Sequence, residues 1–151
     1  MGYTDAPTRW WQEFIEELPA RTAKLAVVRK DGSPHVAPVW VALDHDNGHD
    51  DPDIVFLTAA DTLKGRCILR DPRVSMCLDD ERPPFSFLTV SGAVTTSTDA
   101  DELLHWATAT AARYMGAEQA EAYGRRNAVP GEMVVRLHPE RIVAKVAVAD
   151  F

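Results

Sequence analysis

A short basic segment is the part of the sequence best suited to bind an anion. Its basic residues are Lys64, Arg66, Arg70 and Arg73. They stand out because the chain as a whole carries a formal net charge of −7. Thr62 and Lys64 fall in the first turn of a predicted helix, where backbone N–H groups favour an anion. Arg66, Arg70 and Arg73 are spaced as i, i+4 and i+7, which predicts one helical face. The pattern leaves two interpretations open, a phosphate-binding site or the exposed basic face of a short helix.

The usual sequence signals of catalysis and metal binding are absent. None of the eight glycines lies two or five residues from another, which excludes GxGxxG and Walker A loops. There is no GxSxG, no HExxH and no Cys/His cluster with zinc spacing. The acidic stretch 44–53, with His45 and His49, does not fit the calcium-loop pattern, so we expect a solvated loop. We therefore predict neither a metal site nor a catalytic side chain.

Hydrophobic periodicity predicts the elements that position the basic segment. A helix is expected from Thr8 to Leu18, and a helix capped by Asp61 or Thr62 should end at Arg70, because Pro72 follows. Asp99 and Glu102 form a capping box for a long helix that ends at Gly116, and Glu118–Arg126 reads as another helix. Strands are expected at Ala23–Arg29, Pro34–Leu43, Asp53–Thr58, Val74–Leu78, Phe85–Thr96, Met133–Leu137 and Arg141–Val148.

These elements favour one α+β domain over residues 1–151. About seven strands and four helices, joined largely by tight turns, predict a mainly antiparallel β-barrel rather than βαβ units. The pI near 5.1 disfavours nucleic acid and membrane surfaces as partners. Cys67 and Cys77 lack CxxC spacing, and the first residues do not resemble a signal peptide. We therefore expect a cytoplasmic protein.

Several segments, in order between about Ala23 and Leu137, match the pattern of a known family. They are Asp31–Trp40 (DGSPHVAPVW), Phe56–Thr58 (FLT), Lys64–Ser75 (KGRCILRDPRVS) and Val90–Gly92 (VSG). With these segments the chain resembles the pyridoxamine-phosphate-oxidase-like family of split β-barrel flavoproteins. It is similar in particular to the branch that uses the deazaflavin coenzyme F420, although Cys67 stands where that branch often has asparagine.

The resemblance implies a homodimer of split β-barrels, flanked by helices, with two cofactor sites at the subunit interface. The third strand and the helix after it would hold the cofactor phosphate, at Thr58, Thr62, Lys64, Gly65 and Arg66. The strand segment Ala37, Pro38 and Val39 would lie along the ring system, with Phe85 and Ser86 near it. This agrees with the charge pattern, because a basic helix start suits an anionic cofactor.

The positions where the chain departs from the family pattern indicate which reaction to expect. Pyridoxamine phosphate oxidases place an arginine, a lysine and a glutamine where this chain has Ala37, Ala42 and Phe87, so vitamin B6 oxidation is not expected. We expect an F420-dependent reductase that transfers a hydride to an electron-poor double bond of a small organic substrate. The alternatives are an FMN-dependent oxidoreductase of the same fold, and a non-catalytic protein that binds a cofactor, haem or another tetrapyrrole.

Overall fold

The computed structural model describes residues 4–149. Its strands are β1 (Thr4–Asp5), β2 (Ala23–Val28), β3 (Pro34–Val39), β4 (Ala42–Asp44), β5 (Asp53–Ala59), β6 (Arg73–Asp80), β7 (Ser86–Ser97), β8 (Glu132–Leu137) and β9 (Arg141–Val146). The helices are α1 (Trp10–Glu16), α2 (Leu63–Arg70), α3 (Ala100–Met115), the 3-10 helix η1 (Ala117–Gln119) and α4 (Ala120–Asn127). In the described range, no helix is both long and apolar enough to cross a bilayer.

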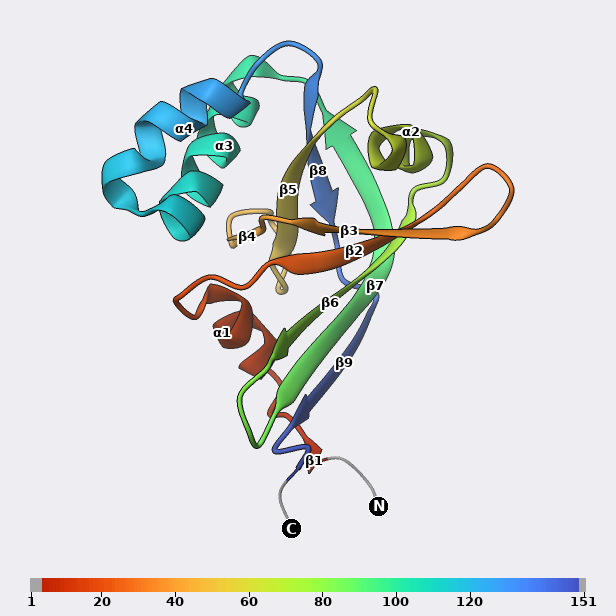
Figure 1. The fold of residues 1–151 in the computed structure, drawn as a ribbon, viewed down its shortest axis with the longest axis vertical. Coiled ribbons are helices and arrows are strands. Elements are labelled where there is room, and N and C mark those ends of the chain that lie inside the picture. The colour runs from red at the N-terminus through yellow and green to blue at the C-terminus, as the bar shows by residue number, and fades with distance from the viewer. Residues whose placement is uncertain (1–3, 150–151) are drawn as a thin grey trace.

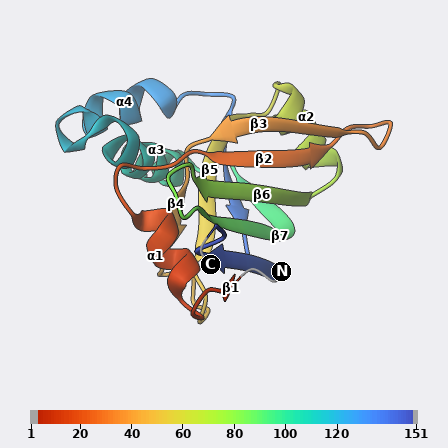
Figure 2. The ribbon, with the colours of Figure 1, turned by 60° about the horizontal axis from the view of Figure 1, so that its bottom comes forward.

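The strands form one strongly bent antiparallel sheet that curls into a split barrel (Figure 1). Its order is β3-β2-β6-β7-β8-β5-β4, and β9 pairs with both β7 and β1. The long strand β7 turns the corner, because Phe87–Ser91 pair with β9 while Val94–Ser97 pair with β8. Figure 2 shows β3, β2, β6, β7 and β9 following one another across one half. The predicted α+β split barrel is confirmed.

Two strand predictions need correction. The expected strand Pro34–Leu43 breaks at Trp40 and Val41, because β3 pairs with β2 whereas β4 pairs with β5 in the other half of the sheet. Phe85 lies outside β7, with a positive φ of 63° that extended backbone does not adopt. The two-residue strand β1 has no apolar residue and gave no sequence signal. The described range therefore holds nine strands instead of about seven.

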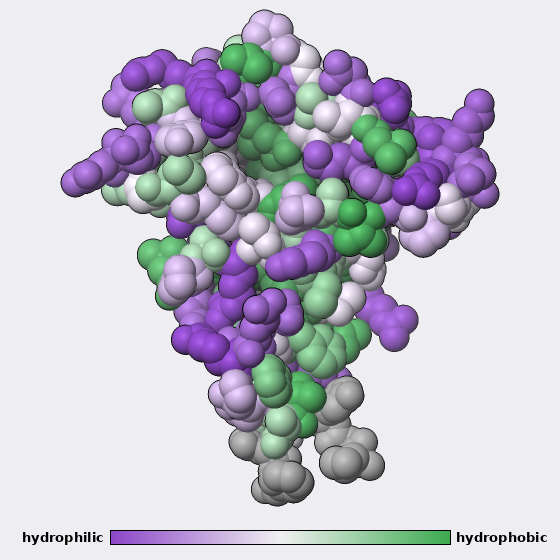
Figure 3. All heavy atoms as spheres, in the orientation of Figure 1, coloured by the Kyte–Doolittle hydropathy of each residue, from purple (hydrophilic) through white to green (hydrophobic). Residues whose placement is uncertain are grey.

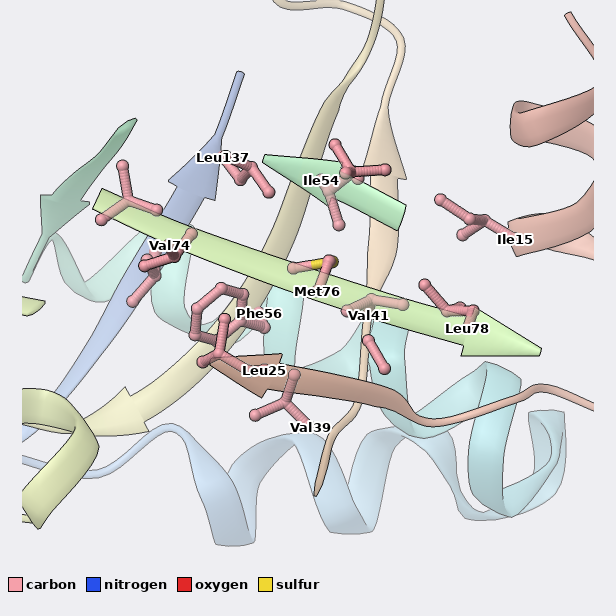
Figure 4. Close-up of a cluster of buried hydrophobic side chains, with 14 of the residues drawn as sticks. Ile15, Leu25, Val39, Val41, Ile54, Phe56, Val74, Met76, Leu78 and Leu137 are labelled. Atoms are coloured by element: carbon pink, nitrogen blue, oxygen red, sulfur yellow. The ribbon is translucent and has the colours of Figure 1, made fainter. Parts of the chain in front are cut away.

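The barrel closes around an apolar interior built from alternate strand residues. Side chains such as Leu25, Phe56, Met76 and Leu78 are essentially inaccessible to solvent and meet inside the barrel, with Ile15 of α1 beside them (Figure 4). Complete burial of each such side chain contributes about 1.5–3 kcal/mol. A second, smaller cluster joins the outer face of β5 and β8 to α3, through residues that include Val55, Val134, Leu103 and Trp106.

The end of α3 is fixed to the barrel by Tyr114. The Tyr114 hydroxyl donates to the backbone oxygen of Arg21 at 2.6 Å and accepts from the backbone N–H of Val41 at 3.1 Å. The ring of Trp40 stacks on that of Tyr114, with centroids 5.1 Å apart and planes 2° from parallel. Arg113 adds bonds to the backbone oxygens of Val41 and Ile15. These contacts hold Trp40 in one orientation.

The start of α3 is held by a capping box that differs from the predicted one. The Asp99 carboxylate accepts from the backbone N–H of Glu102 at 3.0 Å, as the sequence indicates. The Glu102 carboxylate does not complete the box but accepts from Ser97 and Arg136. Since Arg136 also pairs with Asp44 of β4, the helix start is tied to the sheet. Both hydrogen bonds hold the pKa of Glu102 below its usual value.

Strand β3 lies at an edge of the sheet and pairs only with β2. The Arg29 N–H donates to the Ser33 oxygen, so residues 33, 35, 37 and 39 direct their backbone groups toward β2. The backbone groups of residues 34, 36 and 38 therefore point away from the sheet. Two of these positions are Pro34 and Pro38, which have no N–H to donate. Val36 is the one remaining donor along the outer edge of β3 as the structure describes it.

Candidate functional site

Thr62 caps α2 at the end of β5 and shapes the predicted phosphate site. Its hydroxyl accepts from the Gly65 N–H at 3.1 Å and donates to the Ala59 oxygen at 2.8 Å. The hydroxyl of Thr58, a buried residue, lies 3.2 Å from that of Thr62. Because the Thr62 hydrogen is directed to Ala59, Thr58 is the donor of this pair. Both hydroxyl hydrogens are thus used to hold the loop before α2.

Gly65 allows α2 to pack directly against the end of β5. A Cβ atom at this position would lie 2.1 Å from the backbone oxygen of Ala59. No side chain fits in that gap, so the close approach of the two backbones requires glycine at position 65. The approach places Lys64 and Arg66 beside the strand end, and the Arg66 guanidinium donates to the Asp61 oxygen at 2.8 Å.

One basic residue of the predicted helical face lies elsewhere. Helix α2 ends at Arg70, and Arg73 is the first residue of β6. The Arg73 guanidinium pairs with Asp71 at 2.7 Å, and this contact lowers the pKa of Asp71 to about 2. The interpretation of Arg66, Arg70 and Arg73 as one helical face is therefore wrong. Arg73 is neutralised locally, which removes it from the anion site.

The hairpin between β2 and β3 supplies cations that the sequence analysis did not include. Its tip lies beside α2 (Figure 1), and the two together line a groove of about 480 Å³. This basic groove is formed by Arg29, Lys30, Asp31, Leu63, Arg66, Cys67 and Arg70. Over residues 4–149, neither Lys64 nor the four basic residues of the groove form an ion pair with a carboxylate. Five cations that form no close ion pair thus lie on and beside α2 and the hairpin tip, with the carboxylates of Asp31, Asp71 and Glu132 nearby.

The predicted ring-binding strand lies next to Lys64 but not to Phe85. Pro38, Val39 and Lys64 border one cavity, so the structure brings these residues together. Ala37 is half-buried one position earlier. Strand β6 begins at Arg73, just after α2, and ends at Asp80, which pairs with Ser86. Seven residue steps of about 3.3 Å separate these ends by roughly 23 Å, so Phe85 and Ser86 lie far from Lys64 within one chain.

A cavity of about 260 Å³ lies between the sheet and helices α3 and α4. We refer to it as the helix-side cavity, and it is lined by Pro38, Val39, Trp40, Leu57, Lys64, Ala107, Thr110, Asn127 and Glu132. Figure 3 shows the surface hollowed between the α3–α4 pair and α2, with hydrophobic residues at the floor. Only its β3 and α2 residues were predicted from the sequence. The others are Trp40, which follows β3, and residues of β5, α3, α4 and β8 that meet only in the folded chain.

Glu132 gives the helix-side cavity an acidic group beside the Lys64 cation. Glu132 is the first residue of β8 and pairs with Ala59 of β5. Its side chain forms no hydrogen bond within the described residues. Burial raises the pKa of the Glu132 carboxyl, the nearby Lys64 lowers it, and Asp61 raises it. The burial effect is the largest, so the cavity favours the protonated acid relative to an exposed glutamate.

In the acidic loop His45 pairs with a carboxylate, whereas the His49 ring lies beside that of His138, with centroids 5.0 Å apart. His45 contacts Glu16 at 3.1 Å, and His138 contacts Asp53 at 3.0 Å. The loop 44–53 is mostly exposed, as expected of a solvated connection. Between residues 4 and 149, no group of three or more His, Cys, Asp or Glu side chains is arranged to hold a metal ion.

Comparison with solved structures shows the same fold in several proteins. A conserved hypothetical protein from Mycobacterium tuberculosis is 21% identical, with a TM-score of 0.79 over 97% of this chain and 89% of its own. A protein named F420 reductase is 25% identical, with a TM-score of 0.63 over 86% of this chain and 94% of its own. HutZ, the haem storage protein from Vibrio cholerae, is 20% identical, with a TM-score of 0.66 over 91% and 94%.

The family follows from the sequence itself. No curated protein matches the chain. The family model described as pyridoxamine 5'-phosphate oxidase, however, matches residues 8–145. This match includes strands β2 to β8, the helix that carries Lys64 and the helices that cover the cavity. The chain therefore belongs to the pyridoxamine 5'-phosphate oxidase family.

Proposed function

We propose that the protein is a reductase that uses coenzyme F420. The observation that carries the proposal is the set of five cations around α2 and the hairpin tip that form no ion pair within 4 Å. Coenzyme F420 bears carboxylates beyond its phosphate, whereas FMN ends at its phosphate. A basic groove along the same helix that carries Lys64 therefore suits the longer anion. The relative named F420 reductase supports the same choice.

The residues present fit a phosphorylated cofactor. The Lys64 ammonium has no internal ion pair, and the first backbone N–H groups of α2 have no partner within the helix. Thr62 and Gly65 keep this helix start close to β5, and Arg66 adds a second cation. Phosphate bound here would meet two cationic donors and a helix N-terminus, a combination that favours anions.

The protein would contribute binding, orientation and exclusion of water. When bound, the reduced deazaflavin supplies a hydride for an electron-poor double bond of a small organic substrate. Lys64 and Arg66 would hold the phosphate end, and Ala37, Pro38 and Val39 would lie along one side of the ring system. Pro38 and Val39 also line the helix-side cavity, so a substrate bound in that cavity would lie beside the ring system.

A fluorescence titration of the purified protein with F420, and in parallel with FMN, tests the cofactor. We expect F420 to bind more tightly than FMN, because only F420 reaches the basic groove. Replacing both Arg29 and Lys30 by glutamine should weaken F420 binding about fivefold and leave FMN binding unchanged, since exposed ionic contacts are individually weak. Tighter binding of FMN than of F420 would overturn the choice of coenzyme within the family.

A second measurement separates catalysis from carriage. If the protein is a reductase, more than one equivalent of an electron-poor alkene will be reduced for each bound cofactor when reduced F420 is supplied in excess. Reduction that stops at one equivalent would instead favour a cofactor carrier. Binding of haem in place of F420 would favour a storage role like that named for the Vibrio cholerae relative.

We also propose that two copies pair through the exposed face of the β2–β6 sheet. Ala26, Val36 and Ser75 share this face through the pairing register, and Val36 is 59% exposed. Pairing would cover this face. Phe85 and Ser86 of the same chain do not reach Lys64, so any contact from these residues to the cofactor would have to come from a second copy.

The oligomeric state in solution tests this pairing. We expect light scattering to give twice the chain mass of 16.7 kDa. Replacing Ala26 by glutamate should shift the protein to the monomer, because a charge would be buried without a partner. Leu104, which is 45% exposed on α3, provides the matched control, since its replacement by glutamate should leave the dimer intact. A wild-type monomer would rule the pairing out.

A further inference from the structure

The helix-side cavity holds polar groups that the chain itself does not use. Within the described residues, neither the Asn127 amide nor the Glu132 carboxyl forms a side-chain hydrogen bond. Thr110 differs from them, because its hydroxyl bonds back to the Trp106 and Ala107 oxygens of its own helix. Asn127 and Glu132 line the same small space although they come from α4 and β8. Two unused polar groups in one cavity are the pattern expected of a ligand site.

We propose that the helix-side cavity binds the electron acceptor, a flat conjugated carbonyl compound of about one ring, whose oxygen accepts hydrogen bonds from Asn127 and Glu132. This inference rests on the proposed function for the identity of the reductant. It adds the chemical class of the substrate and assigns a role to Glu132.

The apolar walls of the cavity set the shape of the ligand. Trp40, Leu57 and Ala107 line the cavity, and Trp40 is held by its stacking on Tyr114. The Tyr114 hydroxyl is itself bonded to two backbone groups, so this wall is fixed before a ligand arrives. A volume of about 260 Å³ lies below the usual range of about 300–1,000 Å³ for drug-sized ligands. A single conjugated ring therefore fits better than a larger polycyclic compound.

Glu132 is suited to supply the proton that the reaction needs. Hydride addition to the β-carbon of a conjugated carbonyl breaks the C=C π bond and moves the electron pair toward the carbonyl oxygen. The hydride would come from the reduced deazaflavin of the proposed function, which would thereby be oxidised. The resulting enolate needs one proton, and a proton placed on its oxygen gives the enol, which tautomerises to the saturated ketone. The protonated Glu132 carboxyl would donate to the oxygen and release that proton, and it would be reprotonated from solvent because it is only partly buried.

The charges around Glu132 set the pH range of this role. Burial raises the pKa of the carboxyl, and the two charged residues that act on it are Lys64 on α2 and Asp61 just before that helix. Lys64 lowers this pKa and Asp61 raises it. Thr110 and Asn127, from the helices that cover the cavity, are uncharged. As the pH rises through the raised pKa, Glu132 loses its proton and can no longer donate to a carbonyl.

The test uses cyclohex-2-en-1-one, labelled with ¹³C at the carbonyl, as a probe of the cofactor-free protein. We expect titration to shift the backbone amide resonances of Leu57 and Ala107, and the bound carbonyl carbon to move downfield as it accepts hydrogen bonds. Binding should weaken as the pH rises and Glu132 ionises, at a pH above the one at which an exposed glutamate ionises. Replacing Glu132 by glutamine should preserve binding and abolish this pH dependence, because an amide donates at every pH.

Replacing Glu132 or Asn127 by alanine should weaken probe binding about tenfold, the effect of losing one neutral hydrogen bond without a substitute. Glu118→Gln is the matched control, because Glu118 is an exposed carboxylate outside the cavity, and it should change neither affinity nor pH dependence. Equal affinity for the wild type and Glu132→Ala, or resonance shifts confined to other surfaces, would overturn the inference. Because no cofactor is present, a failure of F420 to bind would contradict the proposed function separately.

Discussion

Replacing Lys64 by alanine is expected to weaken F420 binding about 10- to 150-fold. This is the effect of losing a charge-assisted hydrogen bond of about 1.5–3 kcal/mol to the cofactor phosphate. The free energy of unfolding should change little, because the Lys64 ammonium forms no ion pair in the chain as described. Fluorescence titration measures the affinity, and urea unfolding measures the stability.

Two control variants test whether the effect of Lys64→Ala comes from the charge at this position. Lys64→Arg keeps the charge and should retain most of the affinity. Arg125→Ala removes an exposed cation of α4 that pairs with Glu121, so it should leave cofactor binding unchanged. Unchanged affinity in Lys64→Ala would remove this residue from the site. The same variant should raise the pKa of Glu132 further, because the cation that lowers it is gone.

The substitution Gly65→Ala is expected to lower the free energy of unfolding by about 1–3 kcal/mol, the usual cost of excess volume in a packed region. The new Cβ would lie 2.1 Å from the Ala59 oxygen, and neither backbone can move away without shifting α2. Since α2 carries Lys64 and Arg66, F420 affinity should fall together with stability. Urea unfolding followed by circular dichroism, and titration of the folded fraction, measure the two effects.

Gly124→Ala distinguishes a local effect of Gly65 from a general loss of stability. A Cβ at Gly124 would lie 2.2 Å from the Thr108 hydroxyl and 3.0 Å from the Thr108 Cα, where α4 packs against α3. Part of this clash can be relieved by rotating the Thr108 side chain, so the stability loss should be smaller. Cofactor affinity should be retained in this variant. If Gly65→Ala bound F420 as tightly as the wild type, the close packing of α2 on β5 would not position the phosphate site.

The part of the site that could be predicted from the sequence is its local part. Thr62, Lys64, Gly65 and Arg66 are neighbours in the chain, and the cap and charge pattern of one helix place them together. Composition also predicted a solvated loop at 44–53. The helices and most strands followed from periodicity, because each pattern reports a face that is buried against the same barrel.

The remaining site residues depend on contacts between distant segments. Arg29 and Lys30 join the basic groove only because the β2–β3 hairpin reaches α2, and Glu132 joins Lys64 only because β8 pairs with β5. No local pattern marks such residues. The break at Trp40 was missed for the same reason, since the whole stretch Pro34–Leu43 has strand composition and only the pairing partners differ between its halves.

The two prolines of β3 have a consequence for how the protein behaves at high concentration. An exposed edge strand normally offers a row of N–H donors on which another chain can build, the first step of edge-to-edge aggregation. With Pro34 and Pro38 on the outward positions, only Val36 can donate there, so an added strand would find one N–H donor where an edge without prolines offers three. The open edge of the barrel is thereby protected against uncontrolled strand addition while the ends of β3 stay accessible to small ligands.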